Sequence, residues 1–366
     1  MDVCSFTYPG SLSRRRPPAN FLPGDEKCFI HELVKCFPPV KAVSLQDVII
    51  SSDGLCISGN SRLPRPVLLL PDKTTPVRQW LKSGVMVARQ TLRGVPTAQC
   101  EQVHKALLLT DVYFDGFFHW FGDILPKLDA LVQCRADLSD HAILIPASRY
   151  AAYVTESLAA YGLKCRLIPS GSAVRVEQLC FIPRLAPTGN YRAELMLGIR
   201  DRMRERYASS EGGIRLYVSR KQAVKRRLLN EAALEAILAR YGFDSVCMED
   251  LSFPEQVALA SRCQVLAGLH GAGLTHMLWA RPDAAVVEIR GAQESHNNCY
   301  YSLSSDLGYD YYYVPAKQRS RFRPSFLSDF AVDVERFELT LQQILGKPNG
   351  GVAGSAIPLS GDSMSR

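Results

Sequence analysis

Short apolar runs alternate with amphipathic stretches along most of the chain, and this pattern predicts an α/β fold. From Lys105 onward, strands are expected at "KALLLTDVYF", "AILIP", "CRLIP" and "EQLCFIP", with helices over 115–133 and 148–161 between them. After a helix over 191–207, the alternation resumes with strands at "IRLYVS", "DSVCM", "QVLAG", "AVVEI" and "YDYYYV" and helices over 230–241, 253–262, 272–280 and 296–307. Such alternation is typical of parallel sheets covered by helices. We therefore expect two Rossmann-like sheets facing a cleft, with ligands at the carboxyl ends of the strands.

The two runs of alternation divide the chain into parts. Residues 1–205 are expected to form an N-terminal domain, and 206–325 a second Rossmann-like domain. The first of these includes 21–60, where short strands joined by an Asp-Gly hairpin turn are expected. Residues 326–346 are expected to form a C-terminal helix. The Gly, Ser and Pro content of 347–366 predicts a disordered tail.

Composition narrows the class of protein. With 366 residues, 47% hydrophobic and 22% charged, the chain can bury two ordinary domain cores. Its longest apolar runs fall short of the roughly 18 residues that indicate a membrane span. The start of the chain shows no continuous apolar segment after a basic one, so no secretory signal is legible and a cytoplasmic location is expected.

Eleven cysteines are scattered along the sequence. No C-x-x-C pair and no zinc-finger spacing is present, so a disulfide framework and a structural zinc site are not expected. Most of the cysteines are predicted to be buried, reduced thiols.

The net charge of +7 is concentrated in one region. Ten Lys and Arg residues lie between Arg200 and Arg227, a density that attracts phosphate-bearing partners. The part on "LGIRDRMRERY" is better explained as a solvated helix face. The part that follows the next strand is a separate candidate.

The first candidate site is His270, Gly271, Ala272 and Gly273, between a strand and a helix. Glycines allow close approach of backbone N–H groups to a ligand, and a helix amino terminus favours negative charge. This context predicts a phosphate site, although neither G-x-x-x-x-G-K-[ST] nor G-x-G-x-x-G is present. The alternative is a tight turn whose glycines serve only packing.

The second candidate is "LYVSRKQAVKRRLLNEAAL", where Arg220 and Lys221 follow a strand directly. Arg227 lies further along the same loop, and Asn230 is a plausible cap for the helix after it. Guanidinium groups at a strand end can bind a diphosphate bidentately. A solvated basic loop is the alternative.

The third candidate is "FDGFFHWFGDILPKLDAL", in which His119 and Asp123 stand at i and i+4 and share a helix face. Such a pair can deprotonate an acceptor hydroxyl. The aromatic residues around it are typical of a core helix, which is the alternative. Pro126 is expected to kink or interrupt the helix.

Together, "HWFGDILPKL", "YVSRKQAVKRRLLNE", "MEDLSFPEQVALASRCQVLAGLHGAGLTHMLW" and "AAVVEI" resemble glycosyltransferase family 61 over roughly residues 100–315. This family includes bacterial capsule-type enzymes, plant xylosyltransferases and animal protein-linked N-acetylglucosaminyltransferases. Four motifs in order are more specific than any one of them. His276 departs from the family pattern, where Asn is usual.

The resemblance implies a GT-B fold and an inverting transfer of a sugar from a nucleotide donor to a hydroxyl. The first domain would then face the acceptor and the second would bind the nucleotide sugar. Arg220 and Arg227 match family arginines expected to contact diphosphate, with Lys221 and the His270–Gly273 loop beside them. Fixed positive groups imply that no metal and no other cofactor is needed.

The resemblance also assigns supporting and cleft residues. Asn230 and Glu231 match the family's "NE" and are expected to position the loop. Glu288 and Glu249 are candidates for contacts to the donor, with a buried structural acid as the alternative for Glu288. For the general base, Asp123 is favoured over His119, which could orient it or act itself.

The expected partners are a nucleotide-sugar donor and a glycan or lipid-linked oligosaccharide acceptor, and no nucleic acid. Synthesis of capsule, exopolysaccharide or lipopolysaccharide is favoured, with peripheral contact at the inner membrane face through the basic regions. Two other functions stay open: a nucleotide-sugar epimerase of the same fold and a non-catalytic polyanion-binding protein.

Overall fold

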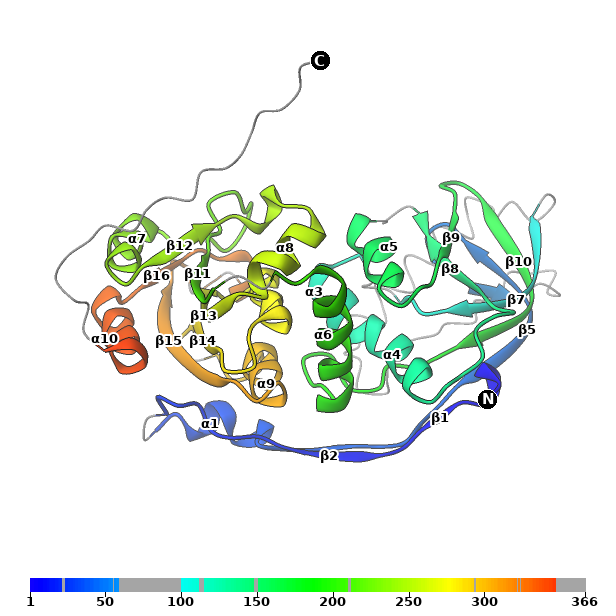
Figure 1. Cartoon of the computed structure of the whole chain (residues 1–366), viewed down its shortest axis with the longest axis horizontal. Helices are drawn as coiled ribbons and strands as arrows, with labels where there is room; N and C mark the ends of the chain where they lie inside the picture. Colours follow the sequence, from blue (N-terminus) through cyan, green and yellow to red (C-terminus); the bar gives the residue numbers. More distant parts are fainter. Residues whose placement is uncertain are drawn as a thin grey trace, which may run out of the picture.

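A computed structural model of the chain describes residues 1–21, 24–54, 56–58, 100–111, 115–147, 151–209, 212–292, 294–320, 322 and 324–346. Two sheets lie side by side, with helices on their faces and between them (Figure 1). This arrangement confirms the predicted α/β class with parallel-sheet domains. The predicted tail 347–366 lies outside the described residues, as do 112–114 of a predicted strand and 148–150 of a predicted helix.

The first sheet has the strand order β6-β5-β10-β7-β8-β9. Its strands are β5 (Val43–Ser51), β6 (Cys56–Ser58), β7 (Glu101–Leu108), β8 (Ala142–Pro146), β9 (Cys165–Ile168) and β10 (Ala173–Phe181). The last four are mutually parallel in the order of a Rossmann half-sheet, and β5 and β6 extend it in antiparallel fashion. Gly54, with φ +81°, lies in the predicted hairpin turn between β5 and β6.

The second sheet has the order β12-β11-β13-β14-β15-β16. Its strands are β11 (Ile214–Val218), β12 (Phe243–Val246), β13 (Cys263–Leu269), β14 (Ala285–Gly291), β15 (Asp310–Gln318) and β16 (Phe330–Val332). All neighbours are parallel except β15 and β16. The chain moves outward in one direction from β11 to β12 and in the other from β13 onward. A ligand crevice is therefore expected at the carboxyl ends of β11 and β13.

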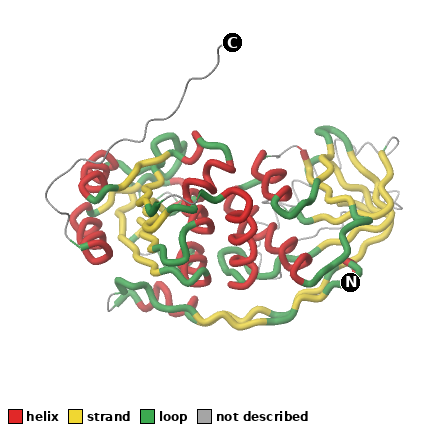
Figure 2. Tube along the Cα trace, viewed as in Figure 1, coloured by secondary structure: helices red, strands yellow, loops and turns green. Residues whose placement is uncertain are grey.

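The helices follow the predicted positions with three local differences (Figure 2). They are α3 (Phe117–His119), α4 (Leu125–Gln133), α5 (Ala152–Ala159), α6 (Ala193–Tyr207), α7 (Glu231–Arg240), α8 (Phe253–Ala260), α9 (Cys299–Asp306) and α10 (Val334–Leu345). The helix expected over 326–346 begins later, because β16 occupies Phe330–Val332. The segment η6 (Ala272–Trp279) is a 3-10 helix where an α-helix was expected. Glycines at its start weaken the α-helical preference.

The third difference is a π-helical turn, η3 (Trp120–Ile124), between α3 and α4. Pro126 explains it, because proline has no N–H for the carbonyl of Gly122 and its ring would clash with that carbonyl in a regular helix. Gly122 also packs closely, because a Cβ there would lie 3.1 Å from the Tyr191 ring. The interruption predicted at Pro126 is thus a wide turn that carries Asp123.

One hydrophobic core joins the two sheets. The ring centroid of Phe121 in the first half lies 5.1 Å from that of Trp279 in the second, and both side chains are fully buried. Burial of each such side chain contributes about 1.5–3 kcal/mol. Helix α6 packs against both α4 and η6, so the two halves are held against each other along this helix.

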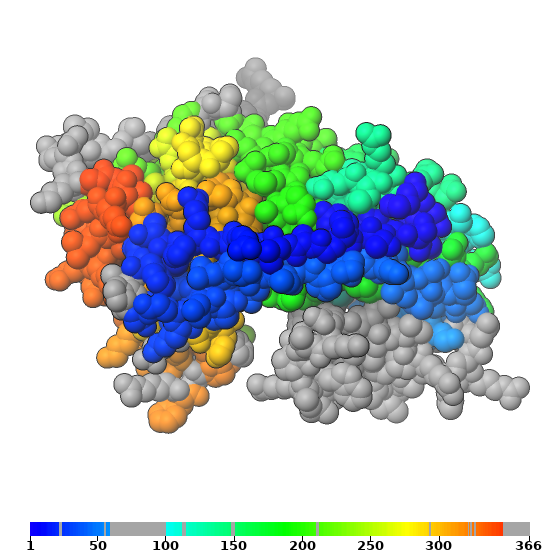
Figure 3. Space-filling view, turned by 90° about the horizontal axis from the view of Figure 1, so that it is seen from below, coloured from blue at the N-terminus to red at the C-terminus, as the bar shows by residue number. Residues whose placement is uncertain are grey.

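The described residues of 1–41 form a strap that crosses both halves (Figure 3). It contains η1 (Val3–Ser5), β1 (Thr7–Tyr8), β2 (Ser11–Arg14), α1 (Glu26–Phe29), η2 (Ile30–Glu32), β3 (Val34–Phe37) and β4 (Val40–Lys41). Its Arg15 is buried and pairs with Asp306 at 2.8 Å and Glu32 at 3.2 Å. The short strands expected over 21–60 are therefore only partly present, because Glu26–Phe29 is helical.

The described residues also bear on two further expectations, the absence of a membrane-spanning helix and the state of the cysteines. Among them, no helix is both long and apolar enough to cross a membrane. All eleven cysteines are free thiols, as predicted, but only five of them are buried.

Candidate functional site

Two predicted segments meet at the crevice of the second sheet. Arg220 follows the end of β11, and Gly271 follows the end of β13. A Cβ on Gly271 would overlap Nη1 of Arg220, so this guanidinium lies directly against the glycine. A Cβ on Gly273 would lie 2.5 Å from Cγ1 of Val218. Both glycines therefore have a packing role, and phosphate binding by the N–H groups of this loop, which includes Ala272, stays a prediction.

Arg220 organises the loop that follows it. Its Nε donates to the carbonyl oxygen of Arg226 and its Nη2 to that of Lys225, each at 2.9 Å. Burial and the neighbouring Arg226 charge both lower the pKa of Arg220. Two guanidinium groups held close together repel each other, so the loop favours an anion between or beside them.

Glu231 and Asn230 hold the two ends of this loop. Buried Glu231 accepts hydrogen bonds from the hydroxyls of Tyr217 at 3.0 Å and Ser219 at 2.8 Å. Asn230 precedes α7 at the cap position, but its side chain makes no cap hydrogen bond within this described helix. It bonds instead to the backbone of Val332 on β16, at 2.8 and 3.1 Å. Asn230 therefore holds β16 against the loop.

The structure separates the basic residues that were predicted together. Exposed Arg227 has its Nη2 3.8 Å from Oδ2 of Asp329, and exposed Lys221 pairs with Glu235 at 2.6 Å. Neither side chain is directed to the strand ends by these contacts. Arg226, which the sequence places in this loop without a specific role, has a buried Nε that bonds to none of the described residues. Its charge acts on Cys299 and Tyr300 of α9, at the crevice.

The two acidic residues predicted to contact the nucleotide sugar, Glu249 and Glu288, differ in exposure. Glu249 is exposed, and its charge acts on Arg220. Glu288 is 0% exposed, with one oxygen bonded to Nδ1 of His270 and the other to the Tyr311 hydroxyl. Burial opposes ionisation, but the interaction with His270 and the Arg290 charge outweigh it, so the pKa of Glu288 lies below its usual range. Glu288 is thus a buried acid bonded to neighbouring side chains, which was the alternative to donor binding. Its contact with a donor stays a prediction.

His270 is held on both sides of its ring. Nδ1 faces Glu288, and Nε2 lies 2.8 Å from the amide nitrogen of Asn297. A neutral ring with its proton on Nδ1 satisfies both contacts. The Tyr300 ring packs edge-on against it at 5.0 Å between centroids. The histidine is thus fixed at the carboxyl end of β13.

On the other half, His119 and Asp123 form the predicted pair. Nδ1 of His119 lies 2.7 Å from Oδ2 of Asp123. Asp123 is buried, whereas 30% of the His119 side chain is exposed. The same carboxylate oxygen lies 3.2 Å from Nη1 of Arg184 and accepts from the Thr188 hydroxyl at 3.1 Å. Asp123 therefore contacts three side chains, and His119 is the more accessible residue of the pair.

A buried charge cluster lies beneath this pair. Arg184 donates from Nε to Asp111 at 2.6 Å, and Lys127 donates to the carbonyl oxygen of Leu109 at 2.8 Å. Lys127 is also 3.9 Å from Asp111. Sequence reasoning missed these residues. The only signal was that Asp111 and Arg184 each follow a strand, β7 and β10, at the same edge of the first sheet.

Aromatic side chains connect the two halves of the site. Phe118, next to His119, packs against Tyr300 at 5.8 Å between centroids, and Tyr300 packs against His270. His276 is buried at the same boundary, 4.7 Å from the Phe117 ring, and burial lowers its pKa to about 3. It is therefore a neutral packing residue there. The structure thus brings the His119–Asp123 pair and the strand ends of the second sheet to one boundary.

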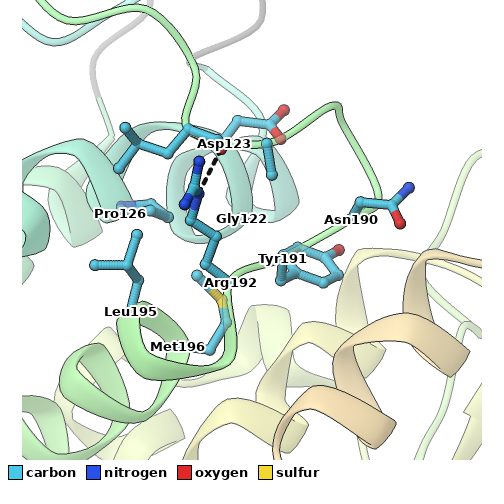
Figure 4. Close-up of a pocket in the computed structure, with 10 residues that line it drawn as sticks. Gly122, Asp123, Pro126, Asn190, Tyr191, Arg192, Leu195 and Met196 are labelled. Carbon is cyan, nitrogen blue, oxygen red and sulfur yellow. Dashed lines mark hydrogen bonds between the residues drawn. The ribbon is translucent and has the colours of Figure 1, made fainter. Parts of the chain in front are cut away.

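A small cavity adjoins Asp123 (Figure 4). Its walls are η3 and α4 on one side and the segment leading into α6 on the other, where Arg192 donates to the carbonyl oxygen of Leu185 at 2.7 Å. The cavity volume is about 10 Å³, which holds about one water molecule. It is too small for a sugar.

The buried ammonium group of Lys127 leads to a prediction about stability. Burial lowers its pKa from 10.5 to about 8, against the opposing effect of Asp111. Between these values the unfolded chain keeps a proton that the folded chain has released, so rising pH favours folding. We expect wild type to gain about 3 kcal/mol relative to Lys127→Met over this range. Urea denaturation at several pH values measures the gain.

Lys41→Met is the control for this comparison, because Lys41 is exposed on the strap. It should follow the wild-type pH dependence. If Lys127→Met follows it too, the buried amine keeps its proton in the folded chain.

Comparisons with known proteins identify a matching family and several similar enzymes. Residues 117–287 match the family described as Glycosyltransferase 61. An EGF domain-specific O-linked N-acetylglucosamine transferase of Drosophila melanogaster is 32% identical over 29% of this chain and 20% of its own length. The enzyme of that name from Gallus gallus is 28% identical over 31% of this chain and 22% of its own.

A Protein O-linked-mannose beta-1,4-N-acetylglucosaminyltransferase 2 of Takifugu rubripes is 33% identical over 26% of this chain and 17% of its own length. The matched segments thus span about a fifth of these relatives. The family segment runs from α3 to β14 and contains His119, Asp123, Arg220 and His270. The resemblance to glycosyltransferase family 61 that the motifs predict is therefore confirmed over residues 117–287.

Proposed function

We propose that the chain transfers a sugar, with inversion, from a nucleotide-sugar donor to a hydroxyl of a glycan acceptor. The observation that carries this proposal is the boundary where His119 and Asp123 meet the strand ends with Arg220 and His270. One side offers a proton acceptor and the other offers cations. Direct displacement at an anomeric carbon needs both of these at once.

In the proposed reaction, His119 acts as the general base. With the Nδ1 proton donated to Asp123, the lone pair of the ring is on Nε2, which takes the proton from the acceptor hydroxyl. The acceptor oxygen forms a bond to the anomeric carbon while the bond from that carbon to the diphosphate oxygen breaks. The diphosphate leaves with the electron pair, and Arg220 and Arg226 stabilise its added negative charge.

The roles of the other side chains follow from this reaction. Asp123 orients His119 and stabilises the imidazolium that forms, while Arg184 and Thr188 hold Asp123 in place. Base action by Asp123 itself, which the sequence favoured, is the alternative within the same site. A GT-B arrangement of the two sheets and activity without added divalent metal belong to the same proposal, because fixed cations replace the metal.

N-acetylglucosamine is the first sugar to test, because the names of the three similar enzymes all contain it. For the acceptor we propose a glycan or a lipid-linked oligosaccharide of a capsule, exopolysaccharide or lipopolysaccharide pathway. A cytoplasmic enzyme in peripheral contact with the inner membrane face would suit such an acceptor. The exposed Arg14 and Arg16 on the strap, beside exposed Leu12, support contact with anionic lipid.

The test is incubation of the purified chain with a panel of nucleotide sugars and glycan acceptors, without added Mg²⁺ or Mn²⁺. We expect nucleoside diphosphate release that depends on the acceptor and a product with the anomeric configuration opposite to that of the donor. An isomeric nucleotide sugar without acceptor product would instead support an epimerase. Binding without either product would support a polyanion-binding protein.

A further inference from the structure

A second cluster of reactive side chains lies near the beginning of the strap, away from the site described above. One donor atom each from Asp2, Cys4 and His141 lie within 4.8 Å of one another. Cys4 belongs to the turn η1, Asp2 is the N-cap residue of that turn, and His141 directly precedes β8 of the first sheet. Carboxylate oxygen, thiolate sulfur and imidazole nitrogen are the donor types that bind zinc.

Backbone contacts hold these side chains together independently of any ligand. Asp2 forms an isolated parallel bridge with Asp137, whose N–H donates to the carbonyl oxygen of Met1 at 2.9 Å. The His141 N–H donates to the carbonyl oxygen of Leu138 at 3.1 Å. The fold itself therefore brings the donor atoms together, although Cys4 and His141 are far apart in the sequence.

His141 is the member of the cluster whose polar atoms lack partners. Both of its ring nitrogens are buried, and neither bonds to any of the described residues. Buried nitrogen atoms are nearly always hydrogen-bonded, because an unpaired buried nitrogen loses its hydrogen bonds to water without gaining others.

Three protein donors and one water molecule complete the four positions of a tetrahedral zinc ion, as at catalytic zinc sites. Asp2 is exposed, so water can reach the fourth position. The side-chain amide of Gln178 donates to the sulfur of Cys4 at 3.5 Å.

We propose that Asp2, Cys4 and His141 bind one zinc ion, with water as the fourth ligand. The ion would join the beginning of the strap to the start of β8 in the first sheet. Zinc-finger spacing is absent because His141 is far from Asp2 and Cys4 in sequence and meets them only in the folded chain. The sequence-based expectation of no structural zinc site rested on the absence of C-x-x-C pairs and zinc-finger spacing.

The test is a titration of the reduced, full-length chain with Co²⁺, which replaces zinc and reports its own ligands. Any purification tag is placed at the C-terminus, so that the surroundings of Asp2 and Cys4 stay unaltered. We expect one equivalent to give the visible bands of tetrahedral cobalt and the near-ultraviolet band of a thiolate–cobalt bond, both displaced by Zn²⁺. Cys4→Ser and His141→Gln should each weaken binding by about tenfold or more.

Cys36→Ser and His104→Gln are the matched controls, because both side chains are exposed and lie outside the cluster. They should bind cobalt as wild type does. A second measurement needs no variant: Zn²⁺ should slow alkylation of Cys4 and leave that of Cys36 unchanged. The proposal is overturned if no stoichiometric binding occurs, if either cluster variant binds as tightly as wild type, or if zinc does not protect Cys4.

Discussion

His119→Ala should lower the rate of sugar transfer by roughly 10²–10⁴-fold, the usual contribution of a general base. The histidine is the accessible member of its pair, with Nδ1 2.7 Å from the buried Asp123 carboxylate. Donor affinity should barely change, because the cations of the second sheet are untouched. Steady-state kinetics and calorimetry with the nucleoside diphosphate measure the two quantities separately.

His104→Ala is the matched control, because His104 also pairs with a carboxylate, Glu177, at 2.6 Å, but on an exposed surface. It should transfer sugar at the wild-type rate. If His119→Ala does so as well, the segment around it is only a core helix and the base lies elsewhere.

Comparison of two variants separates the two candidates for the base. Asp123→Asn keeps the size of the side chain but removes its ability to accept a proton. If His119 is the base, His119→Ala should lose more transfer rate than Asp123→Asn. The reverse result would make Asp123 the base, as the sequence favoured, and His119 its orienting group.

The α/β alternation from β7 to β15 could be predicted because each buried strand is a compact apolar run between helical patterns. The strap could not be predicted in this way. Its short strands have little periodicity, and the contacts that hold it are distant in sequence, such as Arg15 with Asp306. A pairing across the whole chain leaves no local pattern.

The site shows the same division between local and distant information. Turns after strands β11 and β13 indicated Arg220 and His270, because position at a strand end is legible in sequence. The direction of the Arg226 side chain was not, since it depends on a positive φ of 57° at that residue. The place of Glu288 stayed open because β14 is buried on both faces, where alternation does not distinguish a cleft residue from a core one.

Arg220→Ala should weaken binding of the nucleoside diphosphate by about 1.5–3 kcal/mol, the value of a hydrogen bond to a charged group. Its guanidinium lies against Gly271 at the crevice and also holds the carbonyl oxygens of Lys225 and Arg226. Removal therefore takes away one cation and loosens the loop that carries the second. Calorimetry on the folded variant measures the loss.

Neighbouring arginines make this prediction specific. Arg226→Ala should also weaken binding, because its charge acts on Tyr300 at the same crevice. Arg227→Ala should have little effect, because its side chain is exposed beside Asp329. The sequence motif assigned diphosphate contact to Arg220 and Arg227 alike, so the three variants distinguish the motif from the geometry. Equal losses in Arg220→Ala and Arg227→Ala, with none in Arg226→Ala, would show that the loop rearranges when the donor binds.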